Sequence, residues 1–256
     1  MPSSSARHGP GRFCWALLAS SDPAGAQAFY GALAGWEASA AGETPTVLEH
    51  DGQRVAALDR LPAELAQHGV PSHWRSFIST DDVDADAERC RELGATVLGE
   101  PVELGDWARV VPVFDPQGAN FALWQPLALA GADSIAARDA ICWWELNTRD
   151  VGAAREFYRG LFAWDVEEVH AAGVDYVTFT KGGAEVAGLQ AQRPEWGDAP
   201  PVWLTYIGVD TADAAAECMV ELGAKIVGGP LDHPRGRFAV AHDPQDAVVG
   251  VLSTRN

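Results

Sequence analysis

The chain has 256 residues, of which 47% are hydrophobic and 21% are charged, so it can bury an ordinary core and does not have a disordered composition. Its length allows one large domain or two domains of about 125 residues. The formal net charge is -18. Because nucleic-acid binding requires a basic surface, we exclude nucleic acid as a partner.

No apolar run approaches the ~20 residues that a membrane-spanning helix requires, so we also expect no membrane partner. The opening stretch, MPSSSARHGPGR, lacks the continuous apolar segment of a signal peptide, which predicts a cytoplasmic protein. The cysteines have no C-x-x-C spacing and are expected to be reduced, mostly buried thiols: Cys14, Cys90, Cys142 and Cys218.

The first predicted elements are a strand and a helix. A short apolar strand covers residues 13–19. Asp22 then caps a helix that has Pro23 at its first position. Phe29 and Tyr30 lie on this helix at the spacing expected of an apolar face. Short strands follow, so the opening predicts a β-α-β-β-β unit.

A second unit of the same kind completes the first half of the chain. Asp81 precedes an amphipathic helix, and Gly94 follows the helix as a typical C-cap residue. More strands follow, and the Asp-Pro-Gln triplet that starts at Asp115 is a turn signal before the last of them.

The second half of the chain repeats the first. CWALLASSDPAGAQAFYGALAGW, from Cys14, matches CWWELNTRDVGAAREFYRGLFAW, from Cys142, and STDDVDADAERCRELGA matches GVDTADAAAECMVELGA. The final segments also match, since Asp115-Pro116-Gln117 recurs as Asp243-Pro244-Gln245. In the second copy, Gly182-Gly183 adds a hairpin signal. Matches spread along both halves indicate a tandem duplication.

The repeat sets the expected domain boundaries. Residues 1–12 form a tail, residues 13–126 the first domain and residues 141–256 the second. The linker, residues 127–140, is rich in small and polar residues, which suits a connection over the surface.

This pattern resembles the vicinal oxygen chelate superfamily, which includes glyoxalases, bleomycin-resistance proteins and dioxygenases. The resemblance rests on AFYGALAGW and EFYRGLFAW after a strand-Asp-helix start, the helices ending in ELGA, and the Asp-Pro-Gln turns before the last strands. It covers residues 13–252. It implies an α+β fold of two fused domains, in which four βαβββ units form curled mixed sheets (cups) with helices outside and a ligand pocket inside.

Family enzymes bind a divalent metal through His and Glu side chains on the inner face of the cup. In this sequence the corresponding places hold residues that cannot ligate such a cation: Trp15, Ala57, Arg75 and Ala122 in the first copy, and Trp143, Gly188, Leu204 and Gly250 in the second. A one-residue slip would bring His73 closer to one place, but one ligand does not make a site. We therefore expect no metal and no other cofactor.

Strand alternation predicts which side chains face the inside of each cup. They are mostly aromatic, aliphatic or small, which suits a flat apolar ligand held by a few polar groups. For each tryptophan, core packing is the alternative interpretation. The candidate ligand-binding residues are Trp15, Leu17, Arg75, Phe77, Trp124, Trp143, Asn147, Leu204 and Tyr206.

Glu145 is the candidate catalytic residue, because it takes the place of Leu17 on the expected inner face of the second copy. Buried without a cation, its carboxyl group would serve as a general acid or base. Arg75 would share its cup if units pair across the copies, and would lie in the other cup if they pair within a copy. A partly solvated carboxylate at a strand end is the alternative. We expect two unequal pockets, at most one of them functional.

Three functions follow from these residues, and a structural or interaction protein, which the predicted pockets make less attractive, is a fourth alternative. The first is metal-independent binding of a hydrophobic or aromatic small molecule, such as an antibiotic or a natural-product pathway intermediate. The second is a natural-product biosynthetic enzyme (an isomerase, cyclase, lyase or oxygenase) in which Glu145 acts with Arg75 or Tyr206. The third is a metal-dependent glyoxalase or dioxygenase. The sequence is compatible with a monomer or a homodimer, and it does not decide whether any reaction is catalysed.

Overall fold

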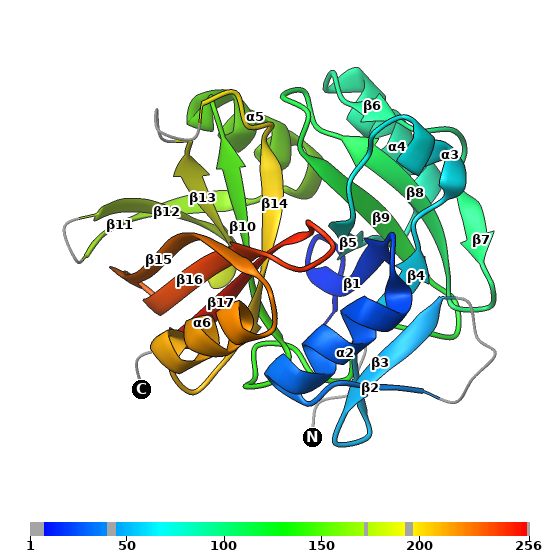
Figure 1. The fold of residues 1–256 in the computed structure, drawn as a ribbon. Helices are drawn as coiled ribbons and strands as arrows, with labels where there is room; N and C mark the ends of the chain where they lie inside the picture. Colours follow the sequence, from blue (N-terminus) through cyan, green and yellow to red (C-terminus); the bar gives the residue numbers. More distant parts are fainter. Residues whose placement is uncertain (1–7, 40–44, 172–173, 193–196, 255–256) are drawn as a thin grey trace.

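The computed structural model describes residues 8–39, 45–171, 174–192 and 197–254. Its strands form two separate sheets, of nine and eight strands, and each sheet is built from one copy of the repeat (Figure 1). The α+β fold expected from the sequence, with two fused domains of curled mixed sheets, is confirmed.

The described part of the first domain contains three helices and nine strands. The helices are α2 (Pro23–Ala34), α3 (Ala63–Gln67) and α4 (Val83–Glu92). The strands are β1 (Phe13–Ser20), β2 (Glu37–Ala38), β3 (Thr46–His50), β4 (Gln53–Arg60), β5 (His73–Ser79), β6 (Thr96–Val97), β7 (Val102–Leu104), β8 (Ala108–Phe114) and β9 (Asn120–Pro126). Their order is β2-β3-β4-β1-β5-β9-β8-β6, and β7 pairs with β8.

The described part of the second domain has the same arrangement. Its helices are α5 (Val151–Phe162) and α6 (Ala212–Glu221). Its strands are β10 (Ile141–Thr148), β11 (Asp165–Ala171), β12 (Val174–Lys181), β13 (Ala184–Ala191), β14 (Val202–Gly208), β15 (Lys225–His233), β16 (Gly236–His242) and β17 (Val248–Thr254). Their order is β11-β12-β13-β10-β14-β17-β16-β15. The hairpin predicted at Gly182-Gly183 connects β12 to β13.

Units pair within each copy. The two units of the first domain join where β1 pairs antiparallel with β5, and those of the second where β10 pairs with β14. This settles the pairing that the sequence left open. Arg75 belongs to the first sheet and Glu145 to the second, so they lie in different cups.

The helix starts differ in detail from the sequence expectation. Asp150, which occupies the place of Asp22 in the second copy, caps α5, because its side chain accepts a hydrogen bond from the backbone N–H of Ala153. Asp22 occupies the N-cap of α2 but makes no side-chain cap hydrogen bond. The N-caps of α4 and α6 are Asp82 and Thr211, each one residue after the Asp that precedes the helix in the sequence pattern, Asp81 and Asp210.

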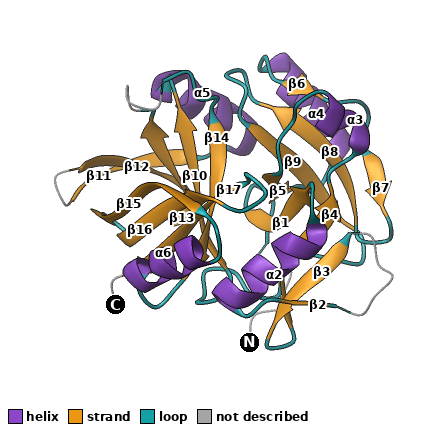
Figure 2. Ribbon diagram, in the orientation of Figure 1, coloured by secondary structure: helices purple, strands orange, loops and turns teal. Residues whose placement is uncertain are grey.

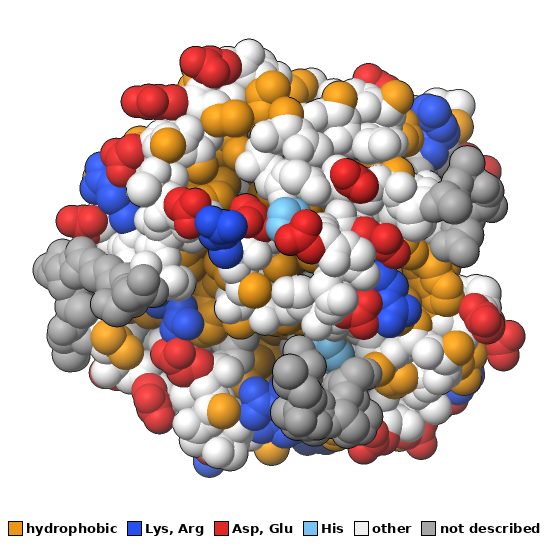
Figure 3. Space-filling model, turned by 90° about the horizontal axis from the view of Figure 1, so that it is seen from below, with side chains coloured by type: hydrophobic (Ala, Val, Ile, Leu, Met, Phe, Trp, Pro, Cys, Tyr) orange, Lys and Arg blue, Asp and Glu red, His pale blue; other side chains and the backbone are white. Residues whose placement is uncertain are grey.

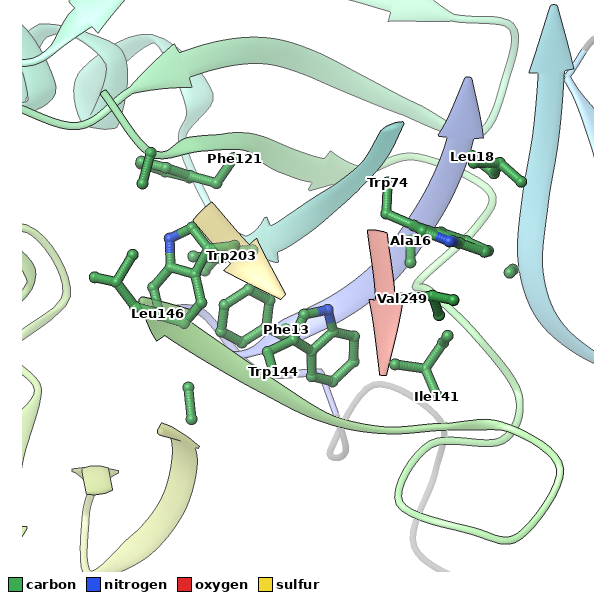
Figure 4. Close-up of a cluster of buried hydrophobic side chains, with 14 of the residues drawn as sticks. Phe13, Ala16, Leu18, Trp74, Phe121, Ile141, Trp144, Leu146, Trp203 and Val249 are labelled. Carbon is green, nitrogen blue, oxygen red and sulfur yellow. The ribbon is translucent and has the colours of Figure 1, made fainter. Parts of the chain in front are cut away.

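The two domains share one core, on the sheet faces opposite the cups. Figure 4 shows Phe13 of the first domain packed against Trp144 and Trp203 of the second. The Phe13 and Trp144 rings stack with centroids 4.7 Å apart, and Trp203 meets Phe13 edge-on at 4.9 Å. Helices from different domains also pack together, α2 with α6 and α4 with α5 (Figures 1 and 2).

A pair of buried hydrogen bonds ties the domains together reciprocally. The hydroxyl of Tyr30, on α2, donates to Oδ2 of Asp243 at 2.9 Å, and the hydroxyl of Tyr158, on α5, donates to Oδ2 of Asp115 at 3.0 Å. Each Asp also accepts backbone N–H bonds in its own turn through Oδ1. The Asp-Pro-Gln segments are therefore turns, as expected, and they are also contacts between the domains.

The linker does more than run over the surface, contrary to the sequence expectation. Leu129 and Ala132 are buried against the inner face of the first sheet. The backbone N–H of Ala132 donates to the carbonyl of Cys14 at 2.8 Å, and the Trp124 indole donates to the carbonyl of Leu129 at 3.0 Å. The linker thus closes part of the first cup.

The four cysteines are free thiols. Two of them, Cys14 and Cys90, are buried, and burial raises the pKa of the Cys90 thiol and that of the Cys142 thiol to about 12.

The surface carries its acidic excess in scattered positions. On the face seen from below, Figure 3 shows carboxylate side chains distributed among basic, uncharged and apolar ones. Among the helices that the structure describes, none is long and apolar enough to cross a membrane.

Candidate functional site

The inner face of the first sheet forms the first cup, and strand register decides which side chains share it. Leu17 of β1 lies opposite Ala57 of β4 and opposite Arg75 of β5. Phe77, two residues after Arg75, lies opposite Trp15 and Ala122. The inner-face positions expected from the sequence are therefore neighbours in the first cup.

The mouth of the first cup contains a cavity of about 180 Å³. Three of the predicted ligand-binding residues line it, and the rest of its wall comes from β1, β4, α3, β5, β7, β8 and β9. The lining residues are Leu17, Ala19, Asp59, Arg60, Pro62, Leu65, His73, Arg75, Phe77, Leu104, Val110, Pro112 and Ala122. The wall is mainly apolar, with few side chains able to orient a ligand.

Arg75 is one of four polar residues in the wall of this cavity, with Asp59, Arg60 and His73. Its Nε donates to Oδ1 of Asn120 at 3.4 Å, and within the described part of the chain it forms no salt bridge. Burial lowers the pKa of the guanidinium. His73 also lines the cavity, and burial first and the Arg75 charge second lower its pKa, against a hydrogen bond to the Pro71 carbonyl that raises it. The cavity therefore offers a partly desolvated positive charge.

Beneath the cavity the first cup is filled. Trp15 and Trp124 are 1% and 0% exposed, pack against each other with ring centroids 6.2 Å apart, and do not line the cavity. Trp124 supports Phe77 edge-on at 5.3 Å. These two predicted ligand-binding tryptophans therefore pack in the core beneath the site.

The second cup has the same strand register and different side chains. Glu145 lies opposite Gly188 of β13 and Leu204 of β14, and Tyr206 lies opposite Trp143 and Gly250. Asn147 follows Glu145 on the same face of β10. The predicted second-cup residues Trp143, Glu145, Asn147, Leu204 and Tyr206 are all buried, at 3 to 6% exposure.

Glu145 contacts several polar groups. The Tyr206 hydroxyl donates to Oε1 at 3.1 Å, and Nε2 of His233 lies 3.7 Å from Oε2. The Tyr176 hydroxyl also interacts with this carboxylate. Burial, and then the charge of Glu145, raise the pKa of both Tyr176 and Tyr206 well above the usual value, so both phenols remain protonated donors. The carboxylate is held in the cup by the second domain's own side chains.

Two glycines make room for these tyrosines. A Cβ at Gly188 would lie 1.6 Å from the Tyr176 hydroxyl, and one at Gly250 would lie 2.3 Å from the Tyr206 ring. The Tyr176 hydroxyl accepts a hydrogen bond from the Trp143 indole at 2.9 Å. Sequence reasoning did not identify Tyr176 or His233. A signal was present, because glycine inside a strand often marks close approach of another group.

Arg235 covers part of the second cup. Its guanidinium carbon lies 3.4 Å from the centre of the Trp143 ring, and its NH1 pairs with Glu185 at 2.8 Å. Arg235 follows His233 in the turn between β15 and β16, and its backbone N–H donates to Nδ1 of His233. Sequence reasoning also missed this residue.

The donor set does not fit a divalent metal at the family's ligand positions. The register places Ala57, Ala122, Gly188 and Gly250 on the inner faces, and none has a side chain that can ligate. In the described ranges there is also no cluster of three or more His, Cys, Asp and Glu side chains able to hold a metal ion. We therefore derive no chemical step through a metal.

Fold and register together define a class of protein. A model of the Glyoxalase/Bleomycin resistance protein/Dioxygenase superfamily matches residues 140–249, and a Glyoxalase-like domain model matches residues 15–124. The chain belongs to this superfamily, and the family resemblance seen in the sequence is confirmed.

Similar proteins were found both by sequence and by structure. The anthracycline biosynthesis protein DnrV of Streptomyces peucetius is 32% identical over 263 residues, a match covering 97% of this chain and 95% of the relative. Among solved structures, the Mn(II)-bound glyoxalase from Novosphingobium aromaticivorans has a TM-score of 0.66 at 16% identity, with 95% of this chain and 82% of that chain covered. The substrate complex of homoprotocatechuate 2,3-dioxygenase from Brevibacterium fuscum has a TM-score of 0.67 at 16% identity, with 96% and 82% covered. The two structures share the fold.

Proposed function

We propose that the first cup binds a flat, largely apolar small molecule that carries an ionised or strongly polarised oxygen, without a metal ion. The observation that carries this proposal is the Arg75 guanidinium, which faces an apolar cavity and forms no salt bridge within the described chain. A partly desolvated guanidinium gains most from an acceptor with two oxygens or a localised negative charge.

The size of the cavity limits what enters it. Its volume is about 180 Å³, and an apolar cavity of roughly 150 Å³ is known to hold one benzene ring. One substituted ring therefore fits between Leu17 and Phe77. The remainder of a larger molecule would lie along the rim, where Leu65 is 38% exposed.

Similarity supports a role in natural-product metabolism. DnrV, a relative along nearly the whole chain, is named as an anthracycline biosynthesis protein. We infer that the ligand is an aromatic antibiotic or an intermediate of its pathway.

Tryptophan fluorescence tests this proposal, because Trp124 packs against Phe77 in the cavity wall. We expect 2-naphthoate to change the emission and its neutral analogue 2-naphthamide to bind more weakly. Arg75→Leu copies Leu204 of the second domain, and it should weaken naphthoate binding at least about tenfold while leaving the amide unchanged. The proposal is wrong if no aromatic acid or quinone in a panel binds, or if Arg75→Leu affects acid and amide equally.

An acid–base enzyme is the second candidate, and a specific contact favours it. The hypothesis has Glu145 act with either Tyr206 or Arg75. The Tyr206 hydroxyl lies 3.1 Å from Oε1 of Glu145, as the first pairing requires, whereas Arg75 belongs to the other cup. In this case Glu145→Gln would abolish turnover of a pathway intermediate and preserve its binding. Unchanged turnover would exclude Glu145 as the catalytic group.

A metal-dependent glyoxalase or dioxygenase is the third candidate, and the donor set argues against it. Elemental analysis of protein purified without chelators decides this point. We expect no stoichiometric Zn, Ni, Mn or Fe, and one equivalent per chain would require a metal site formed by other residues.

A further inference from the structure

The second cup contains buried hydrogen-bond acceptors that the protein does not use. Oδ1 of Asn147 and Oγ1 of Thr178 are buried and have no hydrogen-bond partner within the described chain. The two side chains are 4% and 1% exposed. A buried polar atom without a partner costs stability, so each requires a group that the chain itself does not supply.

These two acceptors and the Glu145 carboxylate lie on one surface. Asn147 is two residues from Glu145 along β10, so both side chains face the inside of the second cup. Thr178 lies opposite Gly188, and Gly188 lies opposite Glu145. The Tyr176 hydroxyl lies over Gly188, between Thr178 and Glu145 along this row. Three acceptors on neighbouring strands thus lie on one inner face, beside the Tyr176 hydroxyl.

Aromatic rings share the inner face of the second cup with these acceptors. Trp143 and Tyr206 come from β10 and β14, and Tyr206 has Phe238 edge-on at 6.3 Å. The Trp143 ring already holds the Arg235 guanidinium at 3.4 Å, so its face accommodates a cation in this environment. A carboxylate and neutral acceptors among aromatic faces are the features that recognise an organic cation.

We propose that the second cup binds the ammonium group of a primary amine attached to an apolar body. An ammonium has three N–H donors. The ammonium would take the place of the Tyr176 hydroxyl beside Glu145. Glu145 would accept one N–H with its charge, and Asn147 and Thr178 would accept the other two, while the aromatic rings contact the carbon atoms next to nitrogen. The proposal is independent of ligand binding in the first cup, which offers a positive charge instead.

Amine binding can be followed at the Trp143 indole N–H, which donates to Tyr176 beside Glu145. We would titrate ¹⁵N-labelled protein at pH 7 with 2-phenylethylamine and with cyclohexylamine, and assign the resonance with Trp143→Phe. Their neutral analogues, 2-phenylethanol and cyclohexanol, are matched in size. We expect the amines to shift the indole resonance and to bind at least about tenfold more tightly than the alcohols.

Three substitutions test the acceptors. Glu145→Gln keeps the shape and removes the charge, and it should reduce the difference between amine and alcohol to about threefold or less. Thr178→Val and Asn147→Ala introduce the residues that the first cup has at these places, Val47 and Ala19, and each should weaken amine binding and leave the alcohol unchanged. Glu217→Gln removes an exposed carboxylate on α6 and should have no effect.

Several outcomes would overturn the proposal. One is equal affinity of amines and alcohols for the wild-type protein, and another is full amine affinity in a folded Glu145→Gln variant. A third is the absence of any shift with either amine at concentrations of ~20 mM, well above a millimolar dissociation constant. That result would mean that Asn147 and Thr178 bond only to water.

Discussion

The two cups share one strand register, but their inner faces carry opposite charge. The first is mainly apolar around the Arg75 guanidinium, with Asp59, Arg60 and His73 also in the cavity wall, and the second is polar around the Glu145 carboxylate. The strand register shows which residues occupy equivalent positions in the two cups. The second cup has Glu145 in place of Leu17, Asn147 in place of Ala19, Thr178 in place of Val47, Tyr206 in place of Phe77, and Leu204 in place of Arg75.

The opposite faces of the same sheets have not diverged in this way. Tyr30 and Tyr158 receive an indole N–H bond each, from Trp74 and Trp203, and donate to an Asp of the other domain. A change in one member would leave a buried partner unsatisfied in the neighbouring domain. Among the residues that the structure describes, the inner faces have no such reciprocal contacts, so each copy could acquire its own chemistry.

The largest effect is expected from removing the packing that distinguishes the first cup. Trp15→Ala should lower the free energy of unfolding by about 3–5 kcal/mol, because Trp15 is fully buried against Trp124 and the linker closes the cup above them. Urea denaturation measures this. Trp107→Ala, at a half-buried partner of Trp15, is the control and should cost less. Equal costs would show that the first cup is not a packed core.

Giving the second cup the residues of the first should raise stability. The double substitution Glu145→Leu with Tyr206→Phe replaces a buried carboxylate and one of its two phenol partners by the pair found at Leu17 and Phe77. Buried charged groups replaced by apolar residues of similar volume often give a gain of about 1–4 kcal/mol. The gain would appear in urea denaturation together with complete loss of amine binding. A large loss of stability would instead mean that this polar group maintains the fold.

The close approach of Tyr176 to Gly188 gives a further test of the difference between the two cups, with a smaller expected effect. Gly188→Ala places a methyl group where the Tyr176 hydroxyl lies, and it should cost about 1–3 kcal/mol and shift the Trp143 indole resonance. The first cup has Ala57 at this position and no tyrosine above it, so Ala57→Gly should cost less, about 1 kcal/mol or below. A Gly188→Ala protein with an unchanged indole resonance would contradict the described position of Tyr176.

Much of the fold was predictable from the repeat. The βαβββ units can be recognised from the matched Asp-Pro-Gln turns, Phe-Tyr pairs and helix ends alone, without knowing which residues touch in the folded protein. Alternation along β1 and β10 also placed Leu17 and Glu145 correctly on the inner faces. The pairing of units was not predictable, because both arrangements satisfy the same alternation.

The missed residues were those brought in by tertiary contacts. His233 reaches Glu145 across the sheet from β15, next to an irregular stretch of that strand. Leu129 fills the first cup from a segment whose composition is typical of a surface connection. Alternation in a single strand contains no information about either contact.

The smallest predicted effect concerns a feature that both domains share, so it tests their symmetry. Asp115 and Asp243 are largely buried, and burial raises the pKa of both carboxyl groups despite hydrogen bonds that lower it. A folded-state pKa above the unfolded value of 3.8 means that the folded protein binds more protons between the two values. This contribution to stability is fully present below the unfolded pKa and is lost as pH rises through the folded pKa.

The contribution of these two carboxyl groups to the free energy of unfolding should therefore increase as pH falls from neutrality toward 4. The increase is at most about 1.4 kcal/mol per pH unit for each group. Asp243→Asn removes one of them, so its melting temperature should respond less to pH than that of the wild-type protein. Asp115→Asn should show the same reduction, because Tyr158 bonds to Asp115 as Tyr30 does to Asp243. Asp165→Asn, at an exposed position, should retain the wild-type response. Unequal behaviour of the two buried variants would show that the domains differ in their shared core as well as in their cups.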